Sequence, residues 1–242
     1  MKRPDWRRGV RYLLHAAYGF LWLGGVHSYV AASGPPAHLA WVGTLFMSLA
    51  AALALMHAPS RARLALLAGG VVGYLIEALG VYTGIPFGGY HYTQAFAPLA
   101  FHVPVVMIAA WLVLSGYVAA LLVPLLGRGL RSVVLGAAAL TLIDFVLDPV
   151  AAGPMDLWRW DAPGVYYGIP WTNFAGWYVA GALVMAVVLR GGPTSWDSAA
   201  LRCVGLSIVA FFTAVAMGAG LLIPAAIGLL LILGHALLRH TR

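Results

Sequence analysis

The chain has 242 residues, of which 62% are apolar and only 9% are charged. Ordinary soluble domains are about 45–50% apolar and about 25% charged, so this chain has too few charges to cover a water-facing surface. A soluble globular protein is therefore excluded, and the composition predicts an integral membrane protein. The net charge of +7 would favour nucleic acid in a soluble chain. In a membrane protein we expect no nucleic-acid partner, because basic residues there orient the spans and contact lipid head groups.

Apolar stretches long enough to cross a bilayer occur eight times along the chain. They predict an all-α, polytopic transmembrane helix bundle that forms a single membrane domain over residues 1–242. The division between the last two stretches is the weakest, because Gly218, Gly220 and Pro224 alone interrupt about forty apolar residues. The eight predicted spans cover residues 12–31, 38–57, 64–83, 99–122, 132–150, 172–189, 199–219 and 221–238.

Basic residues predict how these spans are oriented. With eight spans, thirteen of the fourteen Lys and Arg residues fall on one side of the membrane, and Arg159 is the exception. Because basic segments stay preferentially in the cytoplasm, we predict that both termini are cytoplasmic and that the chain lies in a bacterial cell membrane. The two long connections, residues 84–98 and 151–171, are then on the outer side.

Three of the seven acidic residues lie inside predicted spans, and these are Glu77, Asp144 and Asp148. A carboxyl group in mid-helix costs roughly 2.5–3.5 kcal/mol to insert, so such residues usually face a bundle interior or a water-filled cavity and mark function. Glu77 and Asp144 each lie about six residues, or about 9 Å, from the outer end of their spans. Asp144 and Asp148 are four residues apart and share a helix face. The sequence therefore predicts an acidic pocket that opens outward.

Burial and the proximity of like charges both favour the neutral form of a carboxyl group. A neutral carboxylic acid can donate a proton, so Glu77, Asp144 and Asp148 are the candidate catalytic residues. The alternative is that these acids only hydrogen-bond to neighbouring helices or pair with an outer-loop group such as Arg159.

Aromatic residues crowd the two outer connections. They could form an aromatic belt at the membrane interface, or an apolar groove whose ring faces stabilise a cationic centre. Near the outer ends of their spans, His102 and Asn173 could position a water molecule or serve only as structural hydrogen-bonding groups. The candidate substrate-binding residues are Tyr82, Phe87, Tyr90, Tyr92, His102, Trp111, Trp158, Trp160, Tyr166, Tyr167, Asn173 and Trp177.

Other features of the sequence point to no bound metal or nucleotide. Cys203 is the single cysteine, the histidines lack the spacing of metal ligands, and no phosphate-binding glycine loop occurs. We therefore expect no metal site. The small residues Gly69, Gly70 and Gly73 indicate close packing of one helix against another.

A series of short motifs extends over residues 74–178, and the combination is specific although each motif is short. It comprises Glu77, Gly80, Tyr82, Gly84, Pro86-Phe87-Gly88, Tyr90, Tyr92, Val103-Pro104, Trp111, Asp144, Asp148-Pro149, Trp158, Trp160, Tyr166-Tyr167-Gly168-Ile169-Pro170, Asn173 and Gly176-Trp177. This series resembles the CruF-type carotenoid 1',2'-hydratases, which include the bisanhydrobacterioruberin hydratases. The first two and last two spans match only as generic apolar helices.

The resemblance implies a hydratase that adds water to the terminal double bond of an acyclic carotenoid end group and needs no cofactor. A protonated acid would give its proton to the less substituted alkene carbon, and water would capture the tertiary cation. Asp144 or Glu77 would donate the proton, and Asp148 would share it or orient the water. The implied partners are the carotenoid, water, membrane lipid and other carotenoid-biosynthesis enzymes.

Two alternatives to a hydratase stay open. A carotenoid cyclase starts from the same protonation but captures the cation with a second alkene. A proton-coupled membrane carrier also places acids inside helices, although acids at similar depth near one end argue against a relay across the bilayer. Whether the enzyme is a hydratase or a cyclase, the carotenoid would stay in the bilayer. Its end group would enter the acidic pocket laterally, between helices.

Overall fold

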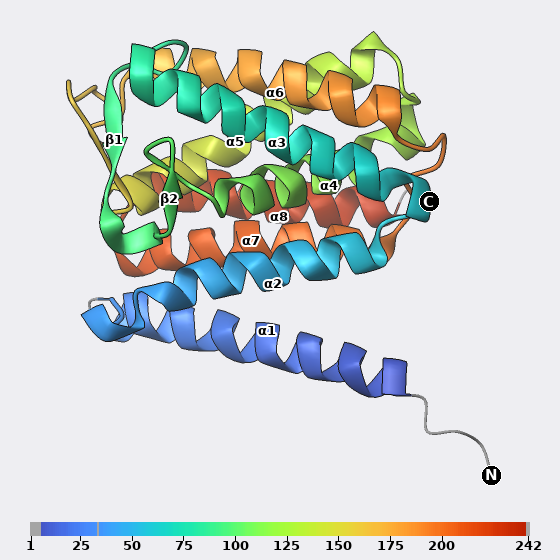
Figure 1. The fold of residues 1–242 in the computed structure, drawn as a ribbon, viewed down its shortest axis with the longest axis horizontal. Helices are drawn as coiled ribbons and strands as arrows, with labels where there is room; N and C mark the ends of the chain where they lie inside the picture. The colour runs from blue at the N-terminus through green and yellow to red at the C-terminus, as the bar shows by residue number, and fades with distance from the viewer. Residues whose placement is uncertain (1–5, 33, 241–242) are drawn as a thin grey trace.

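The structure is a computed structural model in which residues 6–32 and 34–240 are described. Over these ranges it is an all-α bundle of eight helices, which confirms the predicted fold class. Figure 1 shows consecutive helices running in opposite directions. The helices are α1 (Trp6–Ala31), α2 (Trp41–His57), α3 (Ser60–Thr83), α4 (Met107–Leu126), α5 (Leu130–Ala152), α6 (Trp171–Gly191), α7 (Ala199–Gly218) and α8 (Leu222–His240), with short 3-10 turns at Ala37–Leu39 and Gln94–Phe96.

Each of the eight helices coincides with one predicted span, and α7 and α8 are separate. Gly220 lies between them with φ +70°, a left-handed conformation that glycine adopts without steric cost. The predicted start of the fourth span is wrong, because α4 begins at Met107 and not near residue 99. Pro104 has no amide hydrogen to donate, and Phe101 and His102 have positive φ, so the chain before α4 is not helical.

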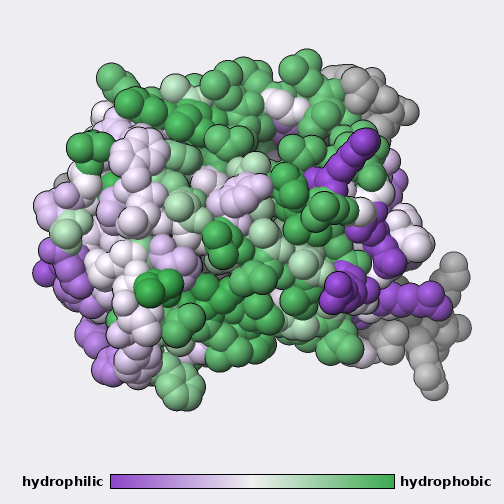
Figure 2. Space-filling view, turned by 90° about the horizontal axis from the view of Figure 1, so that it is seen from above, coloured by the Kyte–Doolittle hydropathy of each residue, from purple (hydrophilic) through white to green (hydrophobic). Residues whose placement is uncertain are grey.

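Six apolar segments within the described ranges are long and hydrophobic enough to cross a membrane, namely Ala37–His57 and helices α3 to α7. The apolar part of α8, Leu222–Leu238, is shorter, and α1 is not among the six. On the face shown in Figure 2, hydrophobic residues cover the middle and hydrophilic residues gather toward the ends. This is the distribution of a protein embedded in a bilayer.

The orientation of the chain in the membrane stays a prediction. Figure 1 shows the start of α1 and the end of α8 at the same end of the bundle, opposite the two long connections. That placement is what the predicted orientation requires. Lys2, Arg3 and Arg242, which also support it, lie outside the described residues.

The structure has two short antiparallel strand pairs. One lies within the segment between α3 and α4, and the other joins that segment to the connection between α5 and α6. The strands are β1 (Tyr90–Tyr92), β2 (Leu99–Ala100), β3 (Val103–Pro104) and β4 (Trp158–Trp160), paired β1 with β4 and β2 with β3. Because alternate residues of a strand point to opposite faces, β1 directs Tyr90 and Tyr92 toward the bundle and His91 toward solvent. Their register pairs Tyr90 with Trp160 and Tyr92 with Trp158. The β1–β4 pair thus presents four aromatic rings across the end of the bundle.

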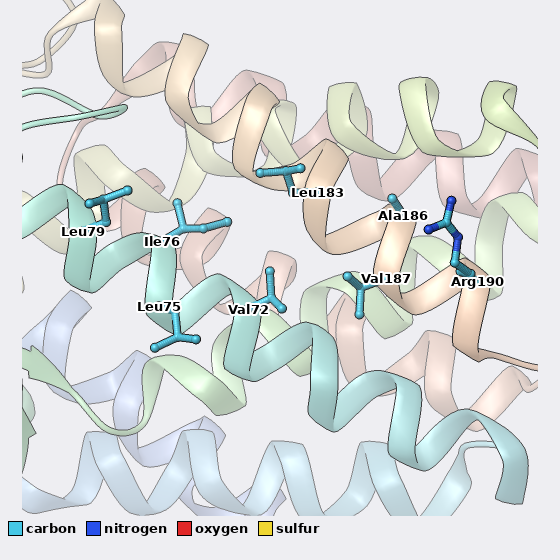
Figure 3. Close-up of a pocket in the computed structure, with 8 residues that line it drawn as sticks. All are labelled: Val72, Leu75, Ile76, Leu79, Leu183, Ala186, Val187 and Arg190. Carbon is cyan, nitrogen blue, oxygen red and sulfur yellow. The ribbon is translucent and has the colours of Figure 1, made fainter.

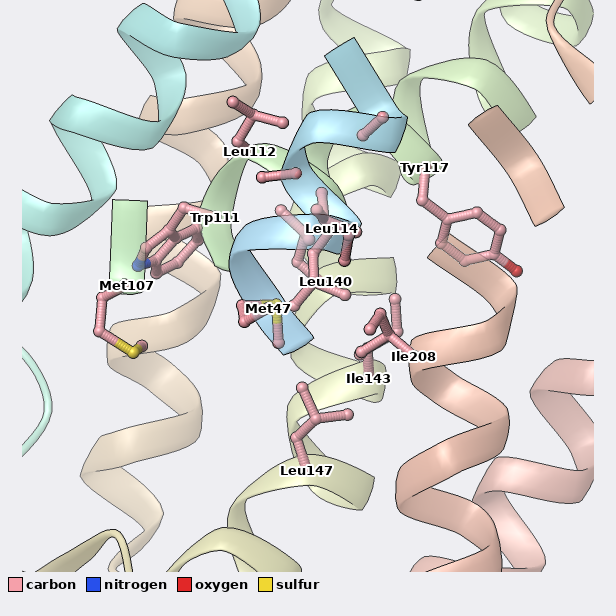
Figure 4. Packing of buried hydrophobic residues seen from close by; sticks show 14 of the residues in the cluster. Met47, Met107, Trp111, Leu112, Leu114, Tyr117, Leu140, Ile143, Leu147 and Ile208 are labelled. Carbon is pink, nitrogen blue, oxygen red and sulfur yellow. The ribbon is translucent and has the colours of Figure 1, made fainter. Parts of the chain in front are cut away.

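Helix α4 lies at the centre and packs against α2, α3, α5, α6 and α7. Figure 4 shows Leu114 of α4 beside Leu140 of α5, with Ile143 of α5 and Ile208 of α7 next to each other below them, and all four are buried. This aliphatic core holds α4 and α5 in fixed relation. The two helices carry four residues of the site described next, namely Met107, Trp111, Asp144 and Asp148.

Candidate active site

The three acids predicted from the sequence lie buried in the bundle near the β1–β4 pair. The exposed fractions of Glu77, Asp144 and Asp148 are 4%, 1% and 1%. On α6, Asn173 donates from Nδ2 to Oδ2 of Asp144 at 2.9 Å and to Oδ2 of Asp148 at 2.5 Å. The four-residue spacing on α5 therefore does place both aspartates on one face, where a single amide joins them.

Glu77 accepts two hydrogen bonds from β1. The hydroxyls of Tyr90 and Tyr92 both donate to Oε2 of Glu77, and the Tyr92 bond is 3.0 Å long. Burial, together with the adjacent Glu77, raises the pKa of both tyrosines well above its ordinary value. Both hydroxyls therefore stay protonated and act as donors. Oε1 of Glu77 takes part in neither bond.

Asp148 accepts a hydrogen bond on each carboxylate oxygen. Trp158 Nε1 donates to Oδ1 at 2.7 Å, and Asn173 donates to Oδ2. Two further indole donors lie close by, because Trp160 adjoins Asp148 and Trp111 adjoins Glu77. The Nε1 atoms of both indoles are buried beside these carboxyl groups and make no hydrogen bond of good geometry with any described residue. A buried donor of this kind usually bonds to water or a ligand, so the site has the capacity to bind an oxygen atom.

A small cavity lies between Glu77 and Asp148. Its volume is about 20 Å³, which is room for one water molecule. Asp144 does not line it, because Asn173 lies between. The lining residues are Glu77, Phe87, Tyr90, Tyr92, Met107, Asp148, Trp158, Trp160, Asn173 and Trp177. Met107 is the lining residue that sequence reasoning missed, since an apolar residue at the start of an apolar helix carries no distinguishing signal.

Trp111 and Trp177 form the apolar wall behind the carboxyl groups. Their rings stack with centroids 4.5 Å apart. Trp111 fits because Gly73 on α3 has no side chain: a Cβ there would lie 2.3 Å from the Trp111 ring. A Cβ at Gly69 or Gly70 would likewise collide with α6 or α4, which confirms that these glycines serve close helix packing.

Tyr166 has a structural role that the sequence analysis did not anticipate. Its hydroxyl donates to the carbonyl oxygen of Phe145 at 2.9 Å. Pro149, four residues after Phe145, has no amide hydrogen with which to pair this carbonyl, so Tyr166 supplies the missing donor. It does not line the cavity.

Three other predicted substrate-binding residues also lie away from the cavity. Tyr82 and His102 contact each other edge to face at 5.5 Å, and both are exposed. The hydroxyl of Tyr167 accepts from the backbone N–H of Ile223, at the start of α8, at 3.3 Å. The structure therefore does not bring Tyr82, His102 and Tyr167 to the acids.

Arg159 does not pair with the buried acids, so that part of the alternative is wrong. Its other part, that the acids only hydrogen-bond to neighbouring helices, stays open, because Asn173 of α6 donates to both aspartates. Its guanidinium lies 2.7 Å from Oδ2 of Asp156, and both side chains are more than half exposed. The Arg159 hydrogen bonds hold the pKa of Asp156 below its ordinary value. Among the residues that the structure describes, those that line the cavity beside Glu77 and Asp148 include aromatic and amide donors and no arginine.

Comparison with known proteins decides the family. A family model described as carotenoid biosynthesis protein matches residues 37–235. The chain belongs to this family. The match extends well beyond residues 74–178, over which the sequence motifs carry the resemblance, and includes α2, α7 and most of α8.

One curated relative in this comparison is a bisanhydrobacterioruberin hydratase from Haloarcula japonica. It is 36% identical over 151 residues, which are 59% of this chain and 48% of the relative. The chain thus spans about half the length of the curated relative it matches. No solved structure matches the chain.

Proposed function

We propose that this carotenoid biosynthesis protein is a carotenoid 1',2'-hydratase. It adds water across the terminal trisubstituted double bond of an acyclic carotenoid and forms a tertiary alcohol. The observation that carries this proposal is the one-water cavity between two buried carboxyl groups. The hydratase named among the relatives supports the same reaction class.

In the proposed reaction Glu77 is the proton donor. Its Oε2 is occupied by the two tyrosine hydroxyls, which leaves Oε1 to carry a proton toward the cavity. Transfer of that proton to the less substituted alkene carbon leaves a tertiary cation on the neighbouring carbon. The faces of Trp177, Trp158 and Tyr90, which line the cavity, stabilise that cation through their ring electrons.

Asp148 is the base that receives a proton from the attacking water. Hydrogen bonds from Trp158 and Asn173 fix both of its oxygens beside the cavity and would stabilise the carboxylate form in which it accepts the proton. The water oxygen bonds to the tertiary carbon, and Asp148 takes the proton that the water loses. A second water molecule then returns this proton to Glu77. Asp144 does not reach the cavity, so it acts as a positioning residue through Asn173.

Expression in a bacterial host that accumulates lycopene tests the proposal. The expected products are pigments heavier by one or two waters. Glu77→Gln and Asp148→Asn should each abolish them while the protein remains in the membrane fraction. Asp161→Asn is the matched control, because this exposed carboxyl group of the outer connection lies outside the cavity, and it should retain the wild-type yield.

Each other outcome would contradict a specific part of the proposal. An isomeric product without added water would show a cyclase. Unchanged pigment in the presence of inserted protein would remove lycopene as a substrate. Full product yield from both Glu77→Gln and Asp148→Asn would show that these carboxyl groups are not the acid and the base.

A further inference from the structure

A groove of about 520 Å³ runs along the outer surface of the bundle between α3 and α6. Seven of its eight lining residues are aliphatic, and the eighth, Arg190, lies at its inner end. Figure 3 shows Val72 and Ile76 of α3 and Leu183 and Val187 of α6 along the space between the two helices. On each helix the lining residues extend over eight positions, a rise of about 10 Å. The groove is therefore an elongated apolar channel open to the lipid.

The helix faces that line this groove continue toward the acid cavity. On α3, Gly80 lies one turn beyond Ile76 on the same stripe, and on α6, Gly176 lies two turns before Leu183. The ring of Phe87 covers both glycines, because a Cβ at Gly80 would lie 2.6 Å from it and one at Gly176 would lie 2.8 Å from it. Phe87 also lines the acid cavity. Phe87 thus lies between the acid cavity and the two glycines that continue the helix faces of the groove.

We propose that this α3–α6 groove binds the polyene chain of the carotenoid, and that the end group reaches the acids by passing Phe87. The inference rests on the proposed hydratase function and names where the rest of the substrate lies. The cavity has room for about one water molecule, so almost all of the substrate must lie outside it.

The other sides of the cavity are closed by protein. The β1–β4 pair covers the outer end, Met107 of α4 lies on one side, and Asn173 joins α5 to α6 on another. The α3–α6 side faces lipid, because Leu75, Leu79 and Leu183 are each about half exposed. An acyclic carotenoid is an apolar rod dissolved in the same lipid, so it can enter the groove without crossing water.

Groove-filling substitutions test this inference through pigment binding as well as turnover. The probe is an acyclic C40 carotenoid in purified membranes, with two variants, Ala186→Trp and Leu183→Trp. Val179→Trp is the matched control, because Val179 is 52% exposed on the same helix and does not line the groove. Binding is read as pigment that copurifies with each variant in the Asp148→Asn background, where no product forms.

The two groove variants should reduce copurified pigment about tenfold, which corresponds to a loss of about 1.4 kcal/mol of binding free energy. In the active background they should raise KM more than they lower kcat, and Val179→Trp should match the wild type. Wild-type binding and turnover in both groove variants would overturn the groove assignment and leave the hydratase proposal intact. A different result would overturn the proposed function and leave the groove assignment standing. In that result, pigment binding is lost in both groove variants, and the protein with Asp148 intact forms no hydrated product.

Discussion

The side-chain amide of Asn173 donates a 2.5 Å hydrogen bond to Oδ2 of Asp148 and so joins α6 to α5 beside the cavity. The same nitrogen contacts Asp144 at 2.9 Å. A single NH2 group can serve two carboxyl groups in this way because it carries two hydrogens. Asn173 is therefore the residue through which the aspartate outside the cavity affects the one that lines it.

Replacing Asn173 should impair turnover without removing either carboxyl group. Asn173→Ala removes two hydrogen bonds to buried acids, each worth about 1.5–3 kcal/mol, and we expect kcat to fall by at least tenfold. The measurement is hydrated carotenoid formed per unit of membrane-inserted protein. Tyr178→Phe on the exposed face of the same helix is the control. An unchanged kcat for Asn173→Ala would show that the amide does not orient Asp148.

Asp144→Asn should lower kcat and change its pH profile, and it should leave KM near the wild-type value. The reason is that Asp144 contacts Asn173 and lies outside the cavity, so its charge acts on Asp148 and not on the substrate. The experiment compares the pH dependence of kcat in the variant and the wild type. Complete inactivation at every pH would instead favour Asp144 as the proton donor.

The buried tyrosines predict a delayed alkaline titration. Burial raises the pKa of Tyr90 and Tyr92 well above the ordinary value near 10. The pKa of each tyrosine is higher in the folded protein than in the unfolded chain. The free energy of unfolding therefore keeps its full value below about pH 10 and falls as the pH rises further. When the protein is titrated with alkali in detergent and tyrosinate is followed by its absorbance, some tyrosines should therefore ionise only as the chain unfolds. Tyr90→Phe and Tyr92→Phe should each reduce that fraction by one residue.

Isotope labelling should identify water as the source of the new hydroxyl group. In H₂¹⁸O the tertiary alcohol should carry the heavy oxygen, and in D₂O the adjacent carbon should carry one deuterium that does not exchange afterward. The balance of the proposed reaction requires both labels. Mass spectrometry of the pigment measures them. A hydroxyl group labelled from ¹⁸O₂ would indicate an oxygenase and contradict the hydration.

The close contact between Gly73 and Trp111 predicts a stability effect. A Cβ at Gly73 would lie 2.3 Å from the ring, whereas a Cβ at Gly24 on α1 would meet nothing within 4 Å. Gly73→Ala should destabilise the protein by about 1–3 kcal/mol through overpacking. Gly24→Ala should be neutral or stabilise the helix by about 0.5–1 kcal/mol. Thermal unfolding in detergent distinguishes the two, and an equal effect of both variants would contradict the packing argument.

Much of the architecture was predictable because the bilayer restricts what a chain can form. A backbone in lipid must satisfy its hydrogen bonds internally, so long apolar stretches predict helices with little ambiguity. The cost of burying a carboxyl group likewise pointed to Glu77, Asp144 and Asp148. The four-residue spacing of the two aspartates predicted their shared face, since that relationship depends only on helical periodicity.

Which residues lie next to each buried acid depends on contacts between segments far apart in the sequence, and helical periodicity does not predict such contacts. The pairing of β1 with β4 brings Tyr90 and Tyr92 to Glu77 and Trp158 to Asp148, yet these strands lie more than sixty residues apart. Tyr82 carries the same aromatic signal and points away from the acids. Composition and periodicity therefore determined the membrane helices and the acids, whereas only tertiary packing decided which donors face each acid and how small the cavity between them is.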